Sequence, residues 1–138
     1  MGTGRDKGAP ASFLIVEDDK DALEILCRMI HSKFPGIEVY RAENGKEGVQ
    51  AFREHLPEVV ITDINMPVMD GIEMAGIIKS IRPETRFIVL TAYTNRVYLE
   101  KFIDIGFSAY ILKPVVFGKL FDAIENCLAE HGDHPADS

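Results

Sequence analysis

The sequence predicts an α/β fold of the (βα)5 type, in which a doubly wound, five-stranded parallel sheet carries helices on both faces. Short apolar runs rich in β-branched and aromatic residues occur five times, and a stretch with helical spacing of apolar residues follows each run. Crossovers between parallel strands are right-handed, which distributes the helices over both faces of the sheet. The 138 residues are the length of one domain.

The five predicted strands differ in how much of their surface is apolar. Four are almost continuously apolar, which is typical of parallel strands covered on both faces. The second run interleaves charged residues, Glu38 and Arg41, and we therefore expect it at an edge of the sheet. In chain order, the five runs are Phe13–Val16, Ile37–Tyr40, Val59–Thr62, Phe87–Leu90 and Ala109–Leu112.

The predicted helices show both periodicity and end signals. Asn44 with Glu47, and Asp70 with Glu73, have the spacing of a capping box. Gly106 suits the position after a helix end. The helix near 95–105 is so apolar that one stripe must be core, and the rest is a candidate docking face. The first and last helices repeat apolar residues at Leu23, Leu26, Cys27, Ile30 and Phe34, and at Phe117, Leu120, Phe121, Ile124 and Leu128.

Composition argues against several classes of protein. The formal net charge of −7 argues against a nucleic-acid surface and against docking to anionic lipid. No apolar run approaches the roughly 18 residues of a membrane span. Two cysteines, Cys27 and Cys127, are too few for a disulfide scaffold and lack metal-site spacing, so we expect a reduced, cytoplasmic compartment.

The two ends of the chain differ from its middle. Residues 1–11 are Gly-rich and lack periodicity, and we expect a disordered leader or a cloning remnant. Residues 12–130 hold every predicted strand and helix and form the single expected domain. Residues 131–138 are polar and are expected to form a flexible tail.

Chemistry-bearing residues follow four of the predicted strands. Glu17 and Asp18 follow the first, Asp63 the third, Thr91 the fourth and Lys113 the fifth. In parallel α/β sheets, ligands bind beyond the carboxyl ends of the strands. The sequence thus predicts that three carboxylates, one hydroxyl and one ammonium meet at one rim.

This set of groups favours metal-assisted phosphoryl transfer onto a carboxylate. Clustered carboxylates suppress one another's ionisation unless a cation intervenes, and Mg²⁺ is commonly held by one or two carboxylates with water and phosphate oxygens. Lys113 and Thr91 can each hold a phosphoryl oxygen. Asp63 is the expected nucleophile, because aspartate can accept a phosphoryl group and the third strand is central if the strand order is 2-1-3-4-5.

Four segments resemble the receiver domains of bacterial two-component response regulators, which have the flavodoxin-like fold of the chemotaxis regulators. The resemblance extends from Ser12 to Glu130 and implies the strand order 2-1-3-4-5. The segment from Asp63 to Gly71 is its most specific part. The matching segments are Leu14–Asp19, Val60–Gly71, Val89–Ala92 and Tyr110–Pro114.

The resemblance implies a metal site and a phosphorylation site. Asp63 matches the phosphorylated aspartate. Glu17 and Asp18 match the acidic pair that organises Mg²⁺ (or Mn²⁺), with Asp18 and Asp63 as direct carboxylate ligands. Asn65 would contribute its backbone carbonyl to the metal, and its side chain lies at a position that tunes the lifetime of the acyl phosphate.

The resemblance also implies a switch. Thr91 matches the switch hydroxyl and Tyr110 the switch aromatic. Lys113 matches the lysine of the site, and its bond to Pro114 is expected to be cis. Tyr93 lies at the second lifetime-tuning position, where its bulk would hinder the attacking water.

The expected function is that of a phosphorelay receiver rather than an enzyme. A histidine kinase or phosphotransfer protein would present a phosphohistidine to Asp63. The face formed by the fourth helix, the fifth strand and the fifth helix would then change and control an output protein or domain. The domain would assist its own phosphorylation and dephosphorylation, without binding nucleic acid or entering a membrane.

Several alternatives compete with this interpretation. A haloacid-dehalogenase-type phosphatase needs Asp-x-Asp, but Asn65 stands in the second position. A flavodoxin is disfavoured because rim carboxylates would repel the flavin phosphate. A phosphorylation-independent pseudo-receiver and a receiver segment of a hybrid histidine kinase remain. The stretch from Gly106 to Tyr110 lacks the acidic pair typical of winged-helix regulators, which weakens the case for their symmetric dimer.

Overall fold

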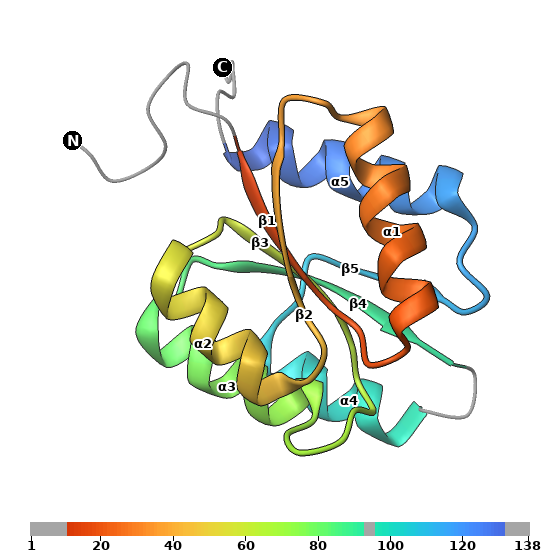
Figure 1. The fold of residues 1–138 in the computed structure, drawn as a ribbon. Coiled ribbons are helices and arrows are strands. Elements are labelled where there is room, and N and C mark those ends of the chain that lie inside the picture. Colours follow the sequence, from red (N-terminus) through yellow and green to blue (C-terminus); the bar gives the residue numbers. More distant parts are fainter. Residues whose placement is uncertain (1–10, 93–95, 132–138) are drawn as a thin grey trace.

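Five strands and five helices alternate along the chain (Figure 1) in a computed structural model that describes residues 11–92 and 96–131. The strands are β1 Ser12–Val16, β2 Glu38–Ala42, β3 Val59–Asp63, β4 Arg86–Thr91 and β5 Ala109–Leu112. The helices are α1 Lys20–Lys33, α2 Gly45–His55, α3 Gly71–Ile81, α4 Arg96–Ile105 and α5 Phe117–His131. The predicted (βα)5 alternation is confirmed.

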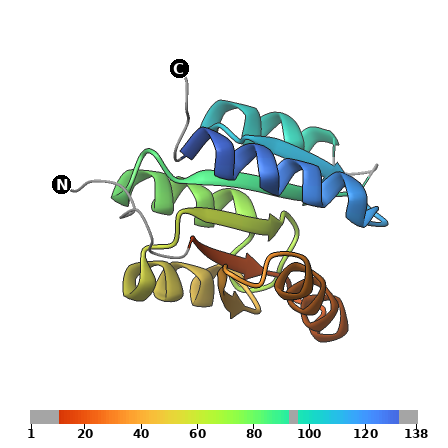
Figure 2. The same cartoon turned by 90° about the horizontal axis from the view of Figure 1, so that it is seen from above.

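All strands are parallel, and their order is β2-β1-β3-β4-β5, as expected. Helices α1 and α5 cover one face of the sheet, and α2, α3 and α4 cover the other (Figure 2). Strand β2 lies at an edge, which confirms the prediction from its charged residues. It runs from Glu38 to Ala42, so it begins one residue later and ends two residues later than the apolar run suggested.

Two apolar clusters, one on each face of the sheet, form the core. In β1, Phe13 and Ile15 pack toward α1 and α5, whereas Leu14 and Val16 pack toward α2 and α3. All four side chains are completely buried, which explains why this strand is apolar throughout. Both cysteines are buried, Cys27 on α1 and Cys127 on α5, and neither forms a disulfide.

Strand β5 departs from the prediction that it is covered on both faces. Ile111 is buried against α5, but Tyr110 and Leu112 are 49% and 42% exposed. The physical reason is the position of α4, whose Phe102 packs on Phe87 of β4, with 5.8 Å between the ring centroids. Because α4 packs against β4, the outer part of β5 is left open.

The apolar residues of α4 divide between core and surface. Phe102 is fully buried, and Leu99 and Ile105 pack partly against the same cluster. Val97 and Ile103 are 64% and 58% exposed. The expected core stripe is therefore present, and an apolar surface lies beside it.

The predicted helix ends are largely confirmed. The side chains of Asn44 and Asp70 accept hydrogen bonds from the amides of Glu47 and Glu73, both at 2.9 Å. The carboxylate of Glu47 accepts from the amide of Glu43 rather than from that of the cap residue, so the capping box is shifted by one residue. Gly106 ends α4 with a φ of +102°, a conformation that glycine adopts without strain.

Helix α3 begins in close contact with the end of β3. A Cβ atom added at Gly71 would lie 2.3 Å from the carbonyl oxygen of Asp63, and the Gly71 amide donates to the carbonyl of Ile64 at 2.8 Å. A backbone oxygen cannot move aside as a flexible side chain can. Glycine is therefore required for α3 to start directly against the Asp63 backbone.

Replacing Gly71 by Ala should destabilise the protein by about 1–3 kcal/mol, because the new methyl group overlaps a backbone oxygen. Gly76 in the same helix is the matched control, since nothing lies within 4 Å of an added Cβ there. Gly76→Ala should stabilise by up to about 1 kcal/mol through helix propensity. Urea denaturation measures both values, and equal effects of the two substitutions would contradict the close approach.

Candidate functional site

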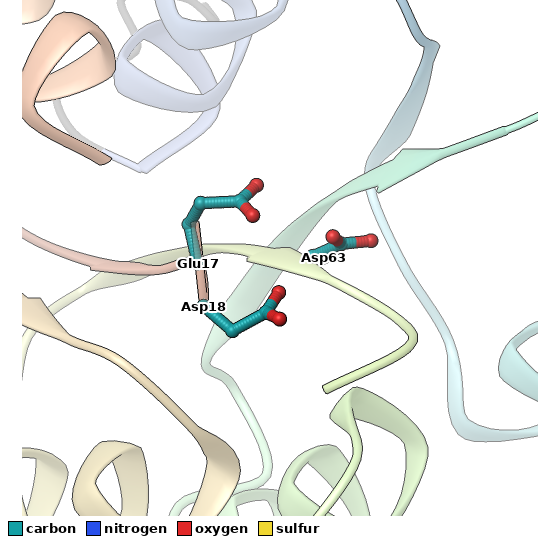
Figure 3. A group of neighbouring side chains, drawn as sticks. All are labelled: Glu17, Asp18 and Asp63. Carbon is teal, nitrogen blue, oxygen red and sulfur yellow. The ribbon is translucent and has the colours of Figure 1, made fainter. Parts of the chain in front are cut away.

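The carboxyl ends of four strands form one rim of the sheet. Glu17 and Asp18 follow β1, Asp63 ends β3, Thr91 ends β4, and Lys113 follows β5. One carboxylate oxygen from each of the three acids lies within 4.8 Å of the others (Figure 3). The structure thus brings together the three carboxylates that the sequence placed at this rim.

The three acids differ in exposure. Glu17 and Asp63 are 2% and 7% exposed, whereas Asp18 is exposed. The cluster therefore has two carboxylates set into the protein and one at its surface. A ligand from solvent can approach it from the side of Asp18.

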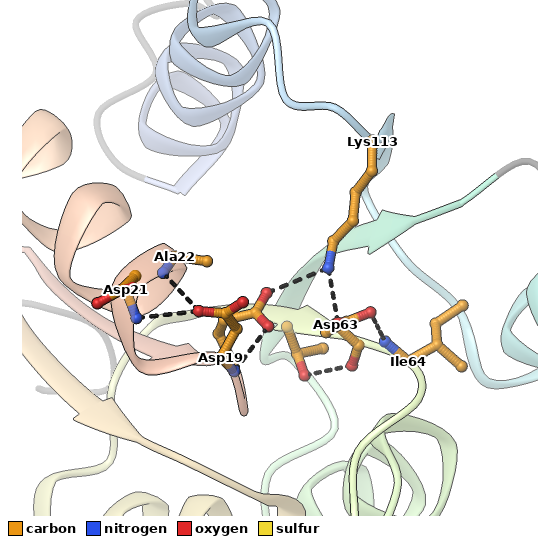
Figure 4. Close-up of polar contacts among 8 residues, drawn as sticks. Asp19, Asp21, Ala22, Asp63, Ile64 and Lys113 are labelled. Carbon is orange, nitrogen blue, oxygen red and sulfur yellow. Dashed lines mark hydrogen bonds and ion pairs between the residues drawn. The ribbon is translucent and has the colours of Figure 1, made fainter.

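Lys113 is the cation of this cluster. Its Nζ donates to Oδ2 of Asp63 at 2.7 Å (Figure 4). It also donates to Oε1 of Glu17 at 3.2 Å. Burial by itself would lower the pKa of Lys113, but the hydrogen bonds and charges of Asp63 and Glu17 outweigh it and raise that pKa. The lysine thus stays charged and connects β5 to β3 and β1. Its peptide bond to Pro114 is cis, as expected.

The other oxygen of Asp63 is held by the backbone. The amide of Ile64 donates to Oδ1 of Asp63 at 2.7 Å, as Figure 4 shows. Bonds to an ionised acceptor are short and strong. Since Lys113 holds Oδ2 and Ile64 holds Oδ1, the carboxylate plane of Asp63 is fixed by two different elements.

Burial is the main cause that raises the pKa of Glu17 above its ordinary value of 4.5. The amide of Asp19, which donates to Oε2 of Glu17 at 3.1 Å, lowers that pKa, and the neighbouring charge of Asp63 raises it. The side chain of Asp19 itself caps α1, accepting from Asp21 and Ala22 (Figure 4). Asp19 is therefore a structural residue and not part of the cluster.

The charges of the cluster favour a divalent cation. Two carboxylates 4.8 Å apart repel by on the order of 3 kcal/mol at an effective dielectric of about 20. One lysine cannot balance three ionised carboxylates. Oxygen donors in this number and spacing suit a hard divalent ion such as Mg²⁺.

The two predicted switch residues lie on the same face of the sheet. Tyr110 is the register partner of Val89, which lies two residues before Thr91 on β4. Thr91 is 1% exposed, and its hydroxyl donates to the carbonyl of Ala92 at 3.3 Å. Tyr110 points outward, with its ring edge-on to Phe107 at 6.0 Å.

Of the two predicted lifetime-tuning residues, the structure describes Asn65 but not Tyr93. Asn65 lies two residues after Asp63, and it is exposed at the same rim. Tyr93 lies outside the described residues, so its predicted position stays a prediction.

Two contacts to Asp63 were not predicted from the sequence. The amide of Ile64 bonds its carboxylate, and the hydroxyl of Thr62 donates to its backbone carbonyl at 2.7 Å. The only sequence signal for the second contact is a threonine at the end of the otherwise apolar run Val59–Thr62. A backbone amide leaves no signal in the sequence.

The model of the response regulator receiver domain matches residues 13–125. The chain belongs to this family. A receiver domain is a regulatory phosphoacceptor rather than a classical enzyme. The acidic cluster of Glu17, Asp18 and Asp63 is consistent with a phosphoacceptor site and typical of the divalent-metal site of a receiver domain.

Curated relatives differ in length from this receiver domain. The transcriptional regulatory protein PdtaR of Mycobacterium tuberculosis is 36% identical over 124 residues, which are 89% of this chain and 59% of PdtaR. The chemotaxis protein CheY of Halobacterium salinarum is 31% identical over 115 residues, 83% of this chain and 94% of CheY. The chain spans 32% of the regulatory protein YesN of Bacillus subtilis. It thus covers only part of some relatives.

Solved structures share the fold. The N-terminal domain of an uncharacterized protein from Wolinella succinogenes has a TM-score of 0.81 and 38% identity, covering 87% of this chain and 95% of that chain. A CheY-like receiver domain from Methanospirillum hungatei has a TM-score of 0.81 and 29% identity. The match covers 88% of this chain and 96% of that chain. In the described part of the receiver domain, no helix is long and apolar enough to cross a membrane.

Replacing Glu17 by Gln should stabilise the metal-free receiver domain at neutral pH, because a neutral isostere avoids burying a charge beside Asp63. The folded protein binds the Glu17 proton more tightly than the unfolded chain does. The wild-type protein therefore gains free energy of unfolding from this group as the pH falls from neutrality toward 4.5. Urea denaturation in EDTA across this pH range should show that the difference in free energy of unfolding between Glu17→Gln and the wild type shrinks as the pH falls.

Asp18→Asn is the control for this experiment, since Asp18 is exposed and its replacement should change stability less. A Glu17→Gln protein that is less stable than the wild type at neutral pH would contradict the role assigned to burial.

Proposed function

We propose that this receiver domain accepts a phosphoryl group from a phosphohistidine of a partner kinase or phosphotransfer protein onto Asp63. The observation that carries this proposal is the Asp63 carboxylate, which ends a central strand beside two other acids and is held by Lys113 at 2.7 Å. An orienting cation and a fixed carboxylate plane are what in-line attack on phosphorus requires.

The transfer itself exchanges one bond for another. A carboxylate oxygen of Asp63 forms the new P–O bond as the P–N bond to the histidine breaks, and the electron pair stays on the ring nitrogen. Lys113 donates to the equatorial phosphoryl oxygens and balances their developing charge. Water later hydrolyses the acyl phosphate, which resets the domain.

Divalent cation binding is the second part of the proposal. Asp18 and Asp63 would provide carboxylate ligands, Asn65 its backbone carbonyl, and Glu17 would orient the cluster. Mg²⁺ or Mn²⁺ supplies positive charge to the transferring phosphoryl group when bound. The support for this assignment is the donor set, three carboxylates with oxygens within 4.8 Å.

The response to phosphorylation is proposed to run through Thr91 and Tyr110. The Thr91 hydroxyl, buried at the end of β4, would move to donate to a phosphoryl oxygen, and the outward ring of Tyr110 would turn into the vacated space. Their shared face of the sheet supports this coupling. The surface of α4, β5 and α5 would thereby change and act on an output protein or domain.

The remaining parts of the proposal concern the lifetime of the acyl phosphate, the extent of the receiver unit and the cellular location of the protein. Asn65 and Tyr93 would tune how fast water reaches the acyl phosphate. Residues 12–130 would form the receiver unit, and the family match at 13–125 supports most of this range. Two buried cysteines that form no disulfide fit a reducing, cytoplasmic location.

Incubation with acetyl phosphate and Mg²⁺ tests the proposal. The wild-type protein should gain one hydroxylamine-sensitive phosphoryl group, seen by intact-mass spectrometry, and Asp63→Asn should abolish labelling. Asp104→Asn, an exposed acid on α4, should label like the wild type.

The absence of labelling in the wild type would contradict the proposal and favour a phosphorylation-independent interaction module. Labelling of Asp63→Asn at the wild-type level would contradict the assignment of the acceptor residue.

A further inference from the structure

We propose that the hydroxyl of Thr62 is a positioning group for the Asp63 carboxylate and acts through the peptide unit that joins Asp63 to Ile64. This inference rests on the proposed function insofar as the carboxylate is a phosphoacceptor, but the geometry that it describes can be measured without any phosphorylation.

Thr62 is the penultimate residue of β3 and is completely buried. It lies on the same face of the sheet as Val60, whose side chain belongs to the apolar cluster under α2, α3 and α4. A hydroxyl at such a place costs free energy unless it makes a hydrogen bond. If this position served only to pack the core, the isosteric valine would stabilise the protein more than threonine does.

The Thr62 hydroxyl donates to the carbonyl oxygen of Asp63 at 2.7 Å. That carbonyl and the amide of Ile64 belong to one planar peptide unit. The same amide donates to Oδ1 of Asp63 at 2.7 Å. Holding the carbonyl therefore fixes the direction of the amide, and the amide fixes one oxygen of the carboxylate.

The peptide unit is also confined from the side of α3. A Cβ added at Gly71 would lie 2.3 Å from the same carbonyl oxygen. The carbonyl thus lies between the start of α3 and the Thr62 side chain. Without the hydroxyl, the carbonyl loses this donor, and the peptide unit becomes freer to rotate.

For the chemistry, the consequence is that Thr62 orients the Asp63 carboxylate before any ligand binds. With Oδ1 held through this peptide unit, Oδ2 is presented to Lys113 at 2.7 Å. Loss of this orientation should slow attack on phosphorus without removing any charged group from the site.

Two substitutions at this position separate positioning from packing. Thr62→Val keeps the shape and loses the hydroxyl, whereas Thr62→Ser keeps the hydroxyl and loses a buried methyl group. Thr85, which is 1% exposed and precedes β4 at the opposite end of the sheet, provides the matched control Thr85→Val.

Three measurements on the full chain test the proposal. Amide hydrogen exchange by NMR in EDTA should show Ile64 exchanging roughly fivefold to tenfold faster in Thr62→Val than in the wild type. Labelling by acetyl phosphate and Mg²⁺ should slow by a similar factor in Thr62→Val. Thr62→Ser should match the wild type in both measurements although its thermal midpoint falls, and Thr85→Val should label normally.

Wild-type exchange at Ile64 together with wild-type labelling in Thr62→Val would overturn the proposal. So would equal defects in Thr62→Val and Thr62→Ser, since these would indicate packing rather than the hydroxyl. If the wild type accepts no phosphoryl group, the proposed function fails, and exchange at Ile64 still decides the role of Thr62.

Discussion

The arrangement of this receiver domain depends on the interaction of one lysine with two buried carboxylates. Lys113 connects the end of β5 to Asp63 on β3 and to Glu17 after β1. With Asp18 beside them, three carboxylates face one ammonium, leaving two negative charges unbalanced when all are ionised. Burial, together with the neighbouring charge of Asp63, raises the pKa of Glu17. The unbalanced negative charge favours binding of a divalent cation at this rim over binding to dispersed surface carboxylates.

The backbone around Asp63 is built to hold this charge in one orientation. Gly71 lets α3 begin against the Asp63 carbonyl, the Ile64 amide bonds one carboxylate oxygen, and Thr62 bonds the carbonyl. Each contact comes from the backbone or from a neutral group. The neutral groups at the end of β3 thus add to the orientation that the charged Lys113 gives the Asp63 carboxylate.

Much of this organisation could be predicted from the sequence because it depends on patterns. Apolar runs predicted the strands, and the rule that parallel strands end at one rim predicted that Asp63 and Lys113 meet. The exposure of Tyr110 and Leu112 could not be predicted, because it depends on how far α4 covers the sheet. The contact of Thr62 escaped prediction because it depends on the orientation of a single peptide unit, which no residue pattern encodes.

Calorimetric titration of Mg²⁺ into the full chain measures whether the unbalanced carboxylate charge at this rim binds a divalent cation. We predict one ion per chain and affinity at least about tenfold weaker in Asp18→Asn, whose exposed position leaves the fold intact. Asp104→Asn should bind like the wild type. No measurable Mg²⁺ binding, or equal affinity in Asp18→Asn and the wild type, would mean that the acidic cluster is not a divalent-cation site.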